Sequence, residues 1–491
     1  MIRVSIQLAS LLGGVALLGC SAPDLSGTNF SCQSNADCGA EQICGSVGGE
    51  PACIARDDTP IRLGMSGPLQ GPSQALGIEM RRGINAMLQS VNDDGGVHGR
   101  RVELESVNDN YDPVLALEMT RQLLDVQTVV EAPDQPDVRG DNSVFALLGN
   151  IGTPTMLATA PVATKNRVVF FGPFTGAQAY LRDDTKSPYV YNYRAGYVDE
   201  TAAMIDYISQ LRTPRVINDP LTDYRRIIVF AQQDSYGDAG YRGVVDAYNK
   251  LSPLPSEDAV FSVKYTREDV ASVDPAIDEA AAYLTGLLDT GSDSSESVAI
   301  IMIDTYLPGN HFIRGLKNWI NEDATRAARL DVLFMNVSFV GGDSLAQALT
   351  ASPWDYEDVR EPGTRRSYAE DVIVTQVVPY YESQARGVSE YREAIRAYDG
   401  GTFTFTSLEG YVVTRLFTEA LKMNGPNLNT ESFVETLDSQ IRDLDIGIGT
   451  ALNFTASNHQ ACNTVWGSHI EDDGTFSVPF VWNSATGIER N

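Results

Sequence analysis

Two hydrophobic periods alternate along most of the chain. Short uninterrupted apolar runs, such as Val298–Ile303 and Ile227–Ala231, are typical of strands that are covered on both faces. Between such runs, apolar residues recur at helical spacing, as Ile84, Met87 and Val91 do. The pattern predicts strands near 61–65, 101–107, 144–148, 168–171, 189–194, 227–232, 260–265, 297–304, 332–339 and 371–378. It predicts helices near 75–93, from 112 onward, and near 199–211, 238–250, 274–289, 309–321, 384–397, 407–424 and 430–440.

Regular alternation of strand and helix favours parallel, doubly wound α/β sheets. About twelve strands are too many for one comfortable open sheet. The chain has 491 residues, which also suits more than one globular unit. We therefore expect two α/β lobes.

Small and polar residues follow several of the predicted strands. In open α/β sheets, ligands bind beyond the carboxyl ends of the strands. These positions hold Ser66–Gly67, Gly149–Thr155, Phe174–Gly176, Gln233–Gly237 and Asp304–Gly309. Each segment taken alone can be a simple turn, because Gly, Ser and Thr are common turn residues. Five such segments at one edge indicate a binding site.

Charge and missing motifs exclude several function classes. The chain carries 36 basic and 65 acidic residues, a formal net charge of −29, which disfavours nucleic acid as a partner. The acidity is spread along the chain and is typical of a solvated surface. There is no phosphate-binding G-x4-G-K-[ST] loop, no G-x-G-x-x-G after a strand and no metal-binding histidine pattern. We expect no cofactor and no metal.

The sequence Gly342–Leu345 spells GDSL, which is the motif of a group of hydrolases. A nucleophilic serine needs a base and an oxyanion hole, and the late Asp-x-x-His of those hydrolases is missing. Asp343 is better interpreted as the N-cap of a helix over 344–349. We therefore expect a protein that is not an enzyme.

The first 20 residues have the pattern of an export signal. Arg3 precedes the uncharged apolar stretch Val4–Leu18, which is short for a membrane span. Leu17–Cys20 resembles the bacterial lipobox, which implies lipidation of Cys20, cleavage before it, and anchoring to a membrane. The alternative is an ordinary secretory signal with an accidental cysteine.

A second cysteine pattern follows at Cys32, Cys38, Cys44 and Cys53. In an exported chain, four close cysteines predict two disulfides in a small loop-rich module, with three pairings possible. A zinc site is the alternative, disfavoured because there is no CxxC pair. Cys462 is expected to be a buried free thiol.

The body of the chain, about residues 60–485, resembles the type I periplasmic solute-binding proteins, in the branched-chain amino acid (Leu/Ile/Val) binding group of ABC importers. The strings that carry the resemblance are Ile61–Leu69, Asn92–Gly99, Asn108–Pro113, Gly152–Thr155, Pro173–Gly176, Gln233–Gly237, Ser338–Gly341 and Ser407–Tyr411. The resemblance implies two Rossmann-like lobes joined by three hinge strands, with a ligand held between them.

With this resemblance, the chain divides into four parts. Residues 1–20 are the predicted signal peptide and 21–58 the tether and disulfide-rich module. Lobe 1 is expected over 59–188 and 331–440, and lobe 2 over 189–330 and 441–491.

The resemblance also implies the ligand-binding residues. On the first lobe they are Ser66, Thr153, Phe174, Thr175 and Gly176, and on the second Tyr197, Tyr236 and Tyr306. Neutral hydroxyl and amide groups suit the two charged ends of an amino acid.

Two departures from the family pattern bear on the ligand. The acidic residue that takes the ligand's ammonium in the family is missing from Tyr306–Asn310, where Asp304, Asp199 or Glu200 are possible substitutes. Phe174 replaces a small residue and narrows the pocket.

The resemblance implies a function in binding rather than catalysis. The protein would capture a small molecule, an amino acid or a related compound, by hinge closure and deliver it to an ABC permease whose ATPase is a separate chain. It would be exported and lipid-anchored to the cell envelope. The alternative is a ligand sensor or cell-envelope regulator built on the same bilobed fold, which the cysteine module favours.

Overall fold

The computed structural model describes residues 31–33, 37–39, 42–47, 50–55, 59–178, 182, 187–210, 224, 226–251, 260–289, 295–351 and 356–490. The chain forms two compact units, Met1–Arg56 and Asp57–Asn491. The predicted signal segment 1–20 and the lipidation site Cys20 lie outside the described residues. Within these residues, no helix combines the length and the apolar character needed to cross a bilayer.

In the N-terminal unit, the strands β1 (Gln42–Val47) and β2 (Glu50–Ala55) pair antiparallel. Disulfides join Cys32 to Cys44 and Cys38 to Cys53. The two predicted disulfides are thus confirmed and their pairing is fixed. Each of the four sulfur atoms is bonded to its disulfide partner, so none of them offers a thiolate for zinc.

The first sheet is parallel and has the strand order β4-β3-β7-β8-β9. Its strands are β3 (Ile61–Gly67), β4 (Val102–Asn108), β7 (Ala146–Leu148), β8 (Val169–Phe171) and β9 (Val190–Tyr191). Its helices are α1 (Gln74–Asp93), α2 (Pro113–Leu123), α3 (Thr153–Lys165), α10 (Arg386–Tyr398), α11 (Phe405–Asn424) and α12 (Thr430–Gln440). We call this sheet and its helices the first lobe. A small hairpin, β5 (Val126–Thr128) and β6 (Val138–Arg139), extends from it.

The second sheet is mixed, with the order β11-β10-β12-β13-β16-β17-β18-β19. Its parallel strands are β10 (Arg226–Gln232), β11 (Val260–Tyr265), β12 (Glu296–Ile303), β13 (Leu330–Asn336) and β16 (Val372–Gln376). The antiparallel strands are β17 (Thr464–Ile470), β18 (Phe476–Asn483) and β19 (Gly487–Arg490).

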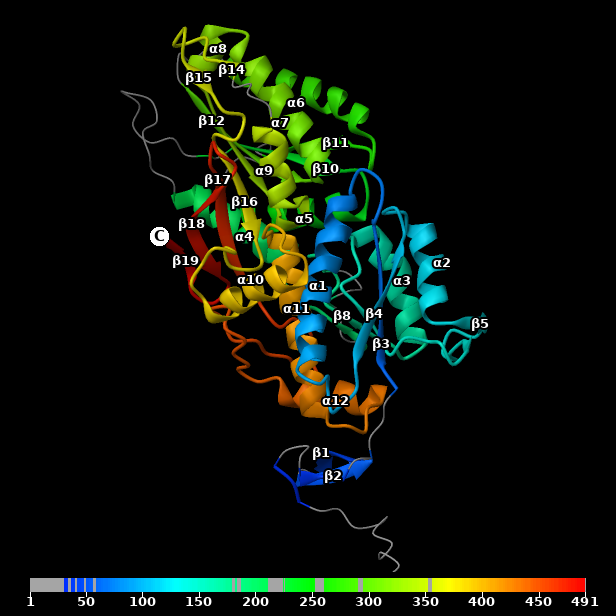
Figure 1. The fold of residues 1–491 in the computed structure, drawn as a ribbon. Coiled ribbons are helices and arrows are strands. Elements are labelled where there is room, and N and C mark those ends of the chain that lie inside the picture. Colours follow the sequence, from blue (N-terminus) through cyan, green and yellow to red (C-terminus); the bar gives the residue numbers. More distant parts are fainter. Residues whose placement is uncertain are drawn as a thin grey trace, which may run out of the picture. The chain divides into compact units, whose positions relative to one another are not determined.

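The helices of this sheet are α4 (Tyr197–Gln210), α5 (Ser235–Tyr248), α6 (Val273–Leu288), α7 (Tyr306–Asn321), α8 (Ala324–Arg329) and α9 (Gly342–Thr350). The short pair β14 (Tyr356–Glu357) and β15 (Arg365–Arg366) lies between α9 and β16 in the sequence. We call this assembly the second lobe. The predicted α/β class with two lobes is confirmed (Figure 1).

The lobe boundaries differ from the prediction. We expected 331–440 in the first lobe, but β13 and β16 pair within the second sheet, and only α10 to α12 return to the first. Similarly, β9 was expected in the second lobe and pairs with β8 of the first sheet. The alternation of strands and helices in the sequence is the same in both lobes, so only the pairing of the strands shows where the chain crosses from one lobe to the other. It crosses three times: after β9, after β16 and before β17.

Helices α1 and α11 lie side by side in the first lobe (Figure 1). A Cβ atom at Gly83 would overlap the carbonyl oxygen of Ser407, and one at Gly410 would overlap that of Met80. Glycine at both positions therefore allows the close approach of these two helices.

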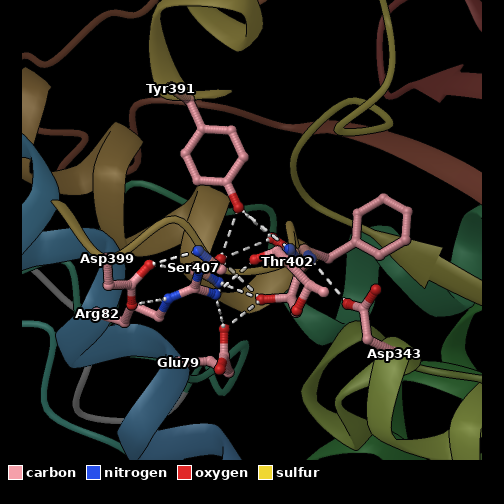
Figure 2. A network of polar contacts seen from close by, with 10 residues as sticks. Glu79, Arg82, Asp343, Tyr391, Asp399, Thr402 and Ser407 are labelled. Atoms are coloured by element: carbon pink, nitrogen blue, oxygen red, sulfur yellow. Dashed lines mark hydrogen bonds and ion pairs between the residues drawn. The ribbon is translucent and has the colours of Figure 1, made fainter. Parts of the chain in front are cut away.

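A polar network holds the segment that connects α10 to α11 (Figure 2). Arg82 on α1 binds Asp399 with two hydrogen bonds, of 2.7 and 2.9 Å, and also contacts Glu79. At the start of α11, the Tyr391 hydroxyl lies 2.6 Å from Ser407 Oγ. The backbone N–H of Phe405 donates to Asp343 Oδ2 at 2.8 Å. Since Asp343 belongs to α9, this bond links the two lobes.

The predicted N-cap role of Asp343 is wrong. Helix α9 begins two residues earlier than predicted, at Gly342, and its cap is Gly341, which has a left-handed φ of 79°. Asp343 instead lies in the first turn, and its carboxylate accepts the Phe405 bond from the first lobe. Burial raises its pKa to about 7.

We expect Asp343 to make stability depend on pH. Its folded pKa lies above the unfolded value of 3.8, so the native state binds this proton more tightly. The stabilisation is present near pH 4 and is lost as pH rises toward 7, with a slope of at most about 1.4 kcal/mol per pH unit. Asp343→Asn should therefore flatten the fall in urea stability between pH 4 and 7.

Asp399→Asn is the control. Arg82 lowers the pKa of Asp399, so the contribution of Asp399 to stability is lost as pH falls, which is opposite to that of Asp343. A pH profile of Asp343→Asn parallel to that of the wild type would contradict the assignment.

Candidate functional site

The predicted ligand-binding residues all lie near the ends of strands or at the starts of the helices that follow those strands. Ser66 is the second-last residue of β3, Thr153 begins α3, and the segment Phe174–Gly176 follows β8. Tyr197 begins α4, and Tyr236 lies in the first turn of α5 after β10. Tyr306 begins α7, after β12. These side chains are buried. The carboxyl ends of parallel strands in both sheets therefore provide this set, as the α/β fold predicts.

Hydroxyl groups gather on the first lobe. Thr153 Oγ1 lies 2.7 Å from Thr175 Oγ1, and the Ala177 N–H donates to Thr175 Oγ1 at 3.2 Å. The Gly176 carbonyl accepts the Tyr197 N–H at 2.7 Å. Ser66 differs from the others, because its hydroxyl donates to Asp109 Oδ2 at 2.7 Å. Thr153 and Thr175 thus form the hydroxyl pair, and Ser66 supports a neighbouring loop.

Aromatic rings from both lobes meet at the same place. The Tyr236 ring lies 5.3 Å from Tyr197 and 4.7 Å from Phe339, measured between centroids. The ring of Phe339 also contacts Phe174 at 5.4 Å and Tyr111 at 6.0 Å. Since Phe174 and Tyr111 belong to the first lobe, these rings close the space between the lobes.

Polar contacts also cross between the lobes at the rim. The Tyr306 hydroxyl donates to the carbonyl of Pro72, and the Ser73 hydroxyl donates to the Glu268 carboxylate. Deeper inside, Gln232 Nε2 donates to the Tyr111 hydroxyl at 3.4 Å. The lobes are therefore closed on one another, in the arrangement that would enclose a ligand.

Arg194 lies at the centre of the first crossing and is fully buried. Its guanidinium contacts Glu409 at 3.5 Å and Glu200 at 3.9 Å, and it lies over the Phe174 ring at 4.5 Å. It also donates to the Ser338 hydroxyl. Burial alone would lower the pKa of Arg194, but the two carboxylates keep it raised, so the guanidinium stays charged. Burial raises the pKa of Glu409 to about 7.

Asp304 is the best candidate for the missing acidic residue. It is fully buried, and neither carboxylate oxygen has a hydrogen-bond partner among the described residues. The carboxylate lies against Gly309 in the first turn of α7, where a Cβ atom would come within 2.5 Å of Asp304 Oδ2. Burial raises the pKa of Asp304 well above its usual range.

The other two acidic candidates are occupied. Asp199 accepts the Gly196 N–H at 2.8 Å and Gln460 Nε2 at 3.0 Å. Glu200 accepts the Ser338 N–H at 2.7 Å and the Thr375 hydroxyl at 2.6 Å.

Three residues of this cluster were not predicted from the sequence: Tyr111, Arg194 and Phe339. Each lies in the loop or turn that follows a strand: Tyr111 after β4, Arg194 after β9 and Phe339 after β13. That signal was present in the sequence. It does not show which long side chains, far apart in the chain, turn toward one another.

Two cavities lie apart from this cluster. One, of about 360 Å³, is lined by residues that include Lys317, Arg360 and Arg366. The other, of about 370 Å³, is lined by residues that include Asn453 and Gln460. Their polar side chains are engaged in internal contacts, as in Lys317 to the Tyr368 carbonyl and Gln460 to Asp199.

Comparison with known proteins agrees with this geometry. Residues 60–298 match the sequence model of the family described as "Periplasmic binding protein". No curated protein matches the chain. A possible leucine/isoleucine/valine-binding protein from Rhodopirellula baltica SH 1 shares 29% identity, with a TM-score of 0.66, over 86% of this chain and 96% of the other.

Two more distant structures show the fold alone. A branched chain amino acid ABC transporter protein from Thermus thermophilus with bound valine has 12% identity and a TM-score of 0.64, covering 89% of this chain and 98% of the other. A fatty acid ABC transporter substrate-binding protein from Thermomonospora curvata has 17% identity and a TM-score of 0.63, covering 86% and 92%. The two α/β lobes and the similar solved structures show that this chain has the type I periplasmic binding protein fold, and its residues 60–298 match the periplasmic binding protein family, which is a family of non-enzymatic solute-binding proteins.

Proposed function

We propose that this protein captures a small zwitterion, an amino acid or a related compound, between its lobes and delivers it to an ABC importer. One observation carries the proposal. Among the described residues, both carboxylate oxygens of Asp304, which follows β12, and the hydroxyl of Tyr197, which begins α4, are buried without a hydrogen-bond partner. A buried polar group without a partner costs free energy, and a ligand with donors and acceptors would supply the missing bonds.

The two ends of the ligand have different candidate partners. The Thr153 and Thr175 hydroxyls, with the Tyr197 hydroxyl, suit a ligand carboxylate. Asp304 suits the ammonium group, which would also favour the ionised form of its carboxyl. Tyr236 and Phe174 cover the apolar part. Tyr306 closes the rim through its bond to Pro72 rather than by reaching inward.

Closure between the lobes would couple binding to recognition by a permease. A ligand that contacts both lobes binds the closed form more tightly and shifts the population toward it. The three crossings are the hinge of this movement. The permease would dock on the closed form, and its ATPase would be a separate chain.

Export and lipid anchoring through Cys20 complete the proposal and rest on the N-terminal sequence.

A sensor or cell-envelope regulator on the same fold is the second candidate function. The disulfide-bonded module between the proposed anchor and the first lobe favours it, because that module adds a separate folded unit to the binding protein.

A thermal-shift panel of amino acids, their amides and small carboxylates tests the proposal. A ligand present at 100 times its Kd should add about 2.7 kcal/mol to the free energy of unfolding and raise the Tm. A flat response over the whole panel would contradict solute capture of this class.

Thr153→Val should weaken binding about 10- to 100-fold, because a hydrogen bond to a charged group is worth about 1.5–3 kcal/mol. Valine keeps the shape of threonine, so the fold should persist. Thr159→Val is a matched control on the same helix, since the Thr159 hydroxyl donates to the Thr155 carbonyl away from the site. Equal calorimetric affinities for both variants would exclude Thr153 from the binding site.

A further inference from the structure

Phe339 lies in the middle of the interlobe cluster. It belongs to the 3₁₀ turn Ser338–Val340, which follows β13 in the second lobe. Its side chain is fully buried, and its ring contacts Tyr236, Phe174 and Tyr111 at 4.7, 5.4 and 6.0 Å. One ring therefore touches the aromatic walls of both lobes.

The backbone around Phe339 is held from several sides. The Ser338 N–H donates to Glu200 at 2.7 Å, and the Ser338 hydroxyl accepts a bond from Arg194. Gly341 has a φ of 79°, and a Cβ atom there would come within 2.7 Å of Leu76 at the start of α1. The turn that carries Phe339 is thus fixed by packing and hydrogen bonds to both lobes.

Phe174 is held in a similar way. Its ring contacts both the Phe339 ring, 5.4 Å away between centroids, and the Arg194 guanidinium, 4.5 Å from its centroid. Close-packed interiors leave few voids larger than a water molecule, and aromatic rings fill the most space. The space next to the Phe174–Gly176 segment is therefore occupied by two phenylalanine rings of the protein itself, Phe174 and the Phe339 ring that contacts it.

We infer that Phe339, together with Phe174, is a specificity-determining residue that limits the site to compact amino acids, of the size of glycine, alanine or serine. Branched-chain and aromatic amino acids are excluded because their side chains would need the space of the Phe339 ring. The inference rests on the proposed function and deepens it by naming the size class of the ligand. It separates this chain from the similar protein that is seen with bound valine.

Titration calorimetry with glycine, alanine, serine, leucine and phenylalanine tests the inference. The wild type should bind alanine or serine at least tenfold more tightly than leucine, since a small change in side-chain size is worth about 10- to 200-fold in an apolar pocket. Phe339→Ala should improve leucine relative to alanine by at least tenfold. Phe339→Leu removes fewer atoms, and it replaces Phe339→Ala in the same measurement if the alanine variant does not fold.

Phe433→Leu is the matched control, because Phe433 is fully buried in the first lobe and contacts Phe145 and Phe417 away from the site. It should lower the Tm without changing the leucine-to-alanine ratio. The inference is overturned if the wild type binds leucine as tightly as alanine, or if a folded Phe339 variant keeps the wild-type ratio. In both cases the proposed function stands. Absence of binding by every member of the panel would instead contradict the proposed function, and this inference with it.

Discussion

Replacing Arg194 by methionine is expected to lower the free energy of unfolding by about 3–5 kcal/mol. Removing one partner of a buried charge cluster leaves the remaining charges uncompensated, which is strongly destabilising. Here the remaining groups are Glu200 and Glu409, both buried and within 3.9 and 3.5 Å of the guanidinium. Urea denaturation followed by circular dichroism measures the loss.

Neutralising the two carboxylates should reverse much of this loss. The triple variant Arg194→Met, Glu200→Gln, Glu409→Gln should be more stable than Arg194→Met alone. Burial already raises the pKa of Glu409 to about 7 and raises that of Glu200. The single variant should therefore gain stability as pH falls and these groups take up protons. A single variant within about 1 kcal/mol of the wild type would show that the cluster does not hold the crossing together.

Asp304→Asn is expected to weaken ligand binding by roughly 30-fold or more, because the truncation of one partner of a buried charge pair costs about 2–5 kcal/mol. The substitution keeps the shape of the side chain and removes its charge. The same variant should unfold no more easily than the wild type without ligand, because the wild-type carboxyl is buried without a hydrogen-bond partner among the described residues.

A pair of ligands that differ only in the amino group serves as the control for the role of Asp304. The wild type should prefer an amino acid over its analogue that lacks the amino group, and Asp304→Asn should lose this preference. The sign of the pH dependence also follows. Burial raises the pKa of the free Asp304 carboxyl and an ammonium ligand would favour its ionised form, so affinity should rise with pH over the range in which the free carboxyl loses its proton. Equal loss of affinity for both ligands would contradict a role for Asp304 at the ammonium group.

Much of the fold followed from the hydrophobic pattern. The strand predicted near 227–232 is β10 (Arg226–Gln232), and the helix predicted near 407–424 is α11 (Phe405–Asn424). Continuous apolar runs and long amphipathic segments mark such elements strongly. The antiparallel strands β17 to β19 were not predicted. Strand β17 pairs with β16, and β18 and β19 extend the sheet outward from it, so these strands depend on contacts with residues far away in the sequence.

The site was predictable as a set of loops and less so as a set of contacts. Thr153 and Thr175 lie together because β7 and β8 are neighbours in the sheet, which the parallel pattern favours. Arg194 and Ser338, the neighbour of Phe339, are 144 residues apart in the sequence, and their contact depends on the crossings between the lobes. Sequence periodicity holds no information on those crossings, so the ring and charge cluster at the centre could be found only in three dimensions.

A crystal structure of the protein with a bound compact amino acid tests the central claim most directly. The account predicts ligand density between the lobes, with its carboxylate within hydrogen-bond distance of Thr153 Oγ1 and its ammonium group at Asp304. A ligand seated elsewhere, such as in the cavity beside Lys317, with the interlobe rings in unbroken contact, would contradict it.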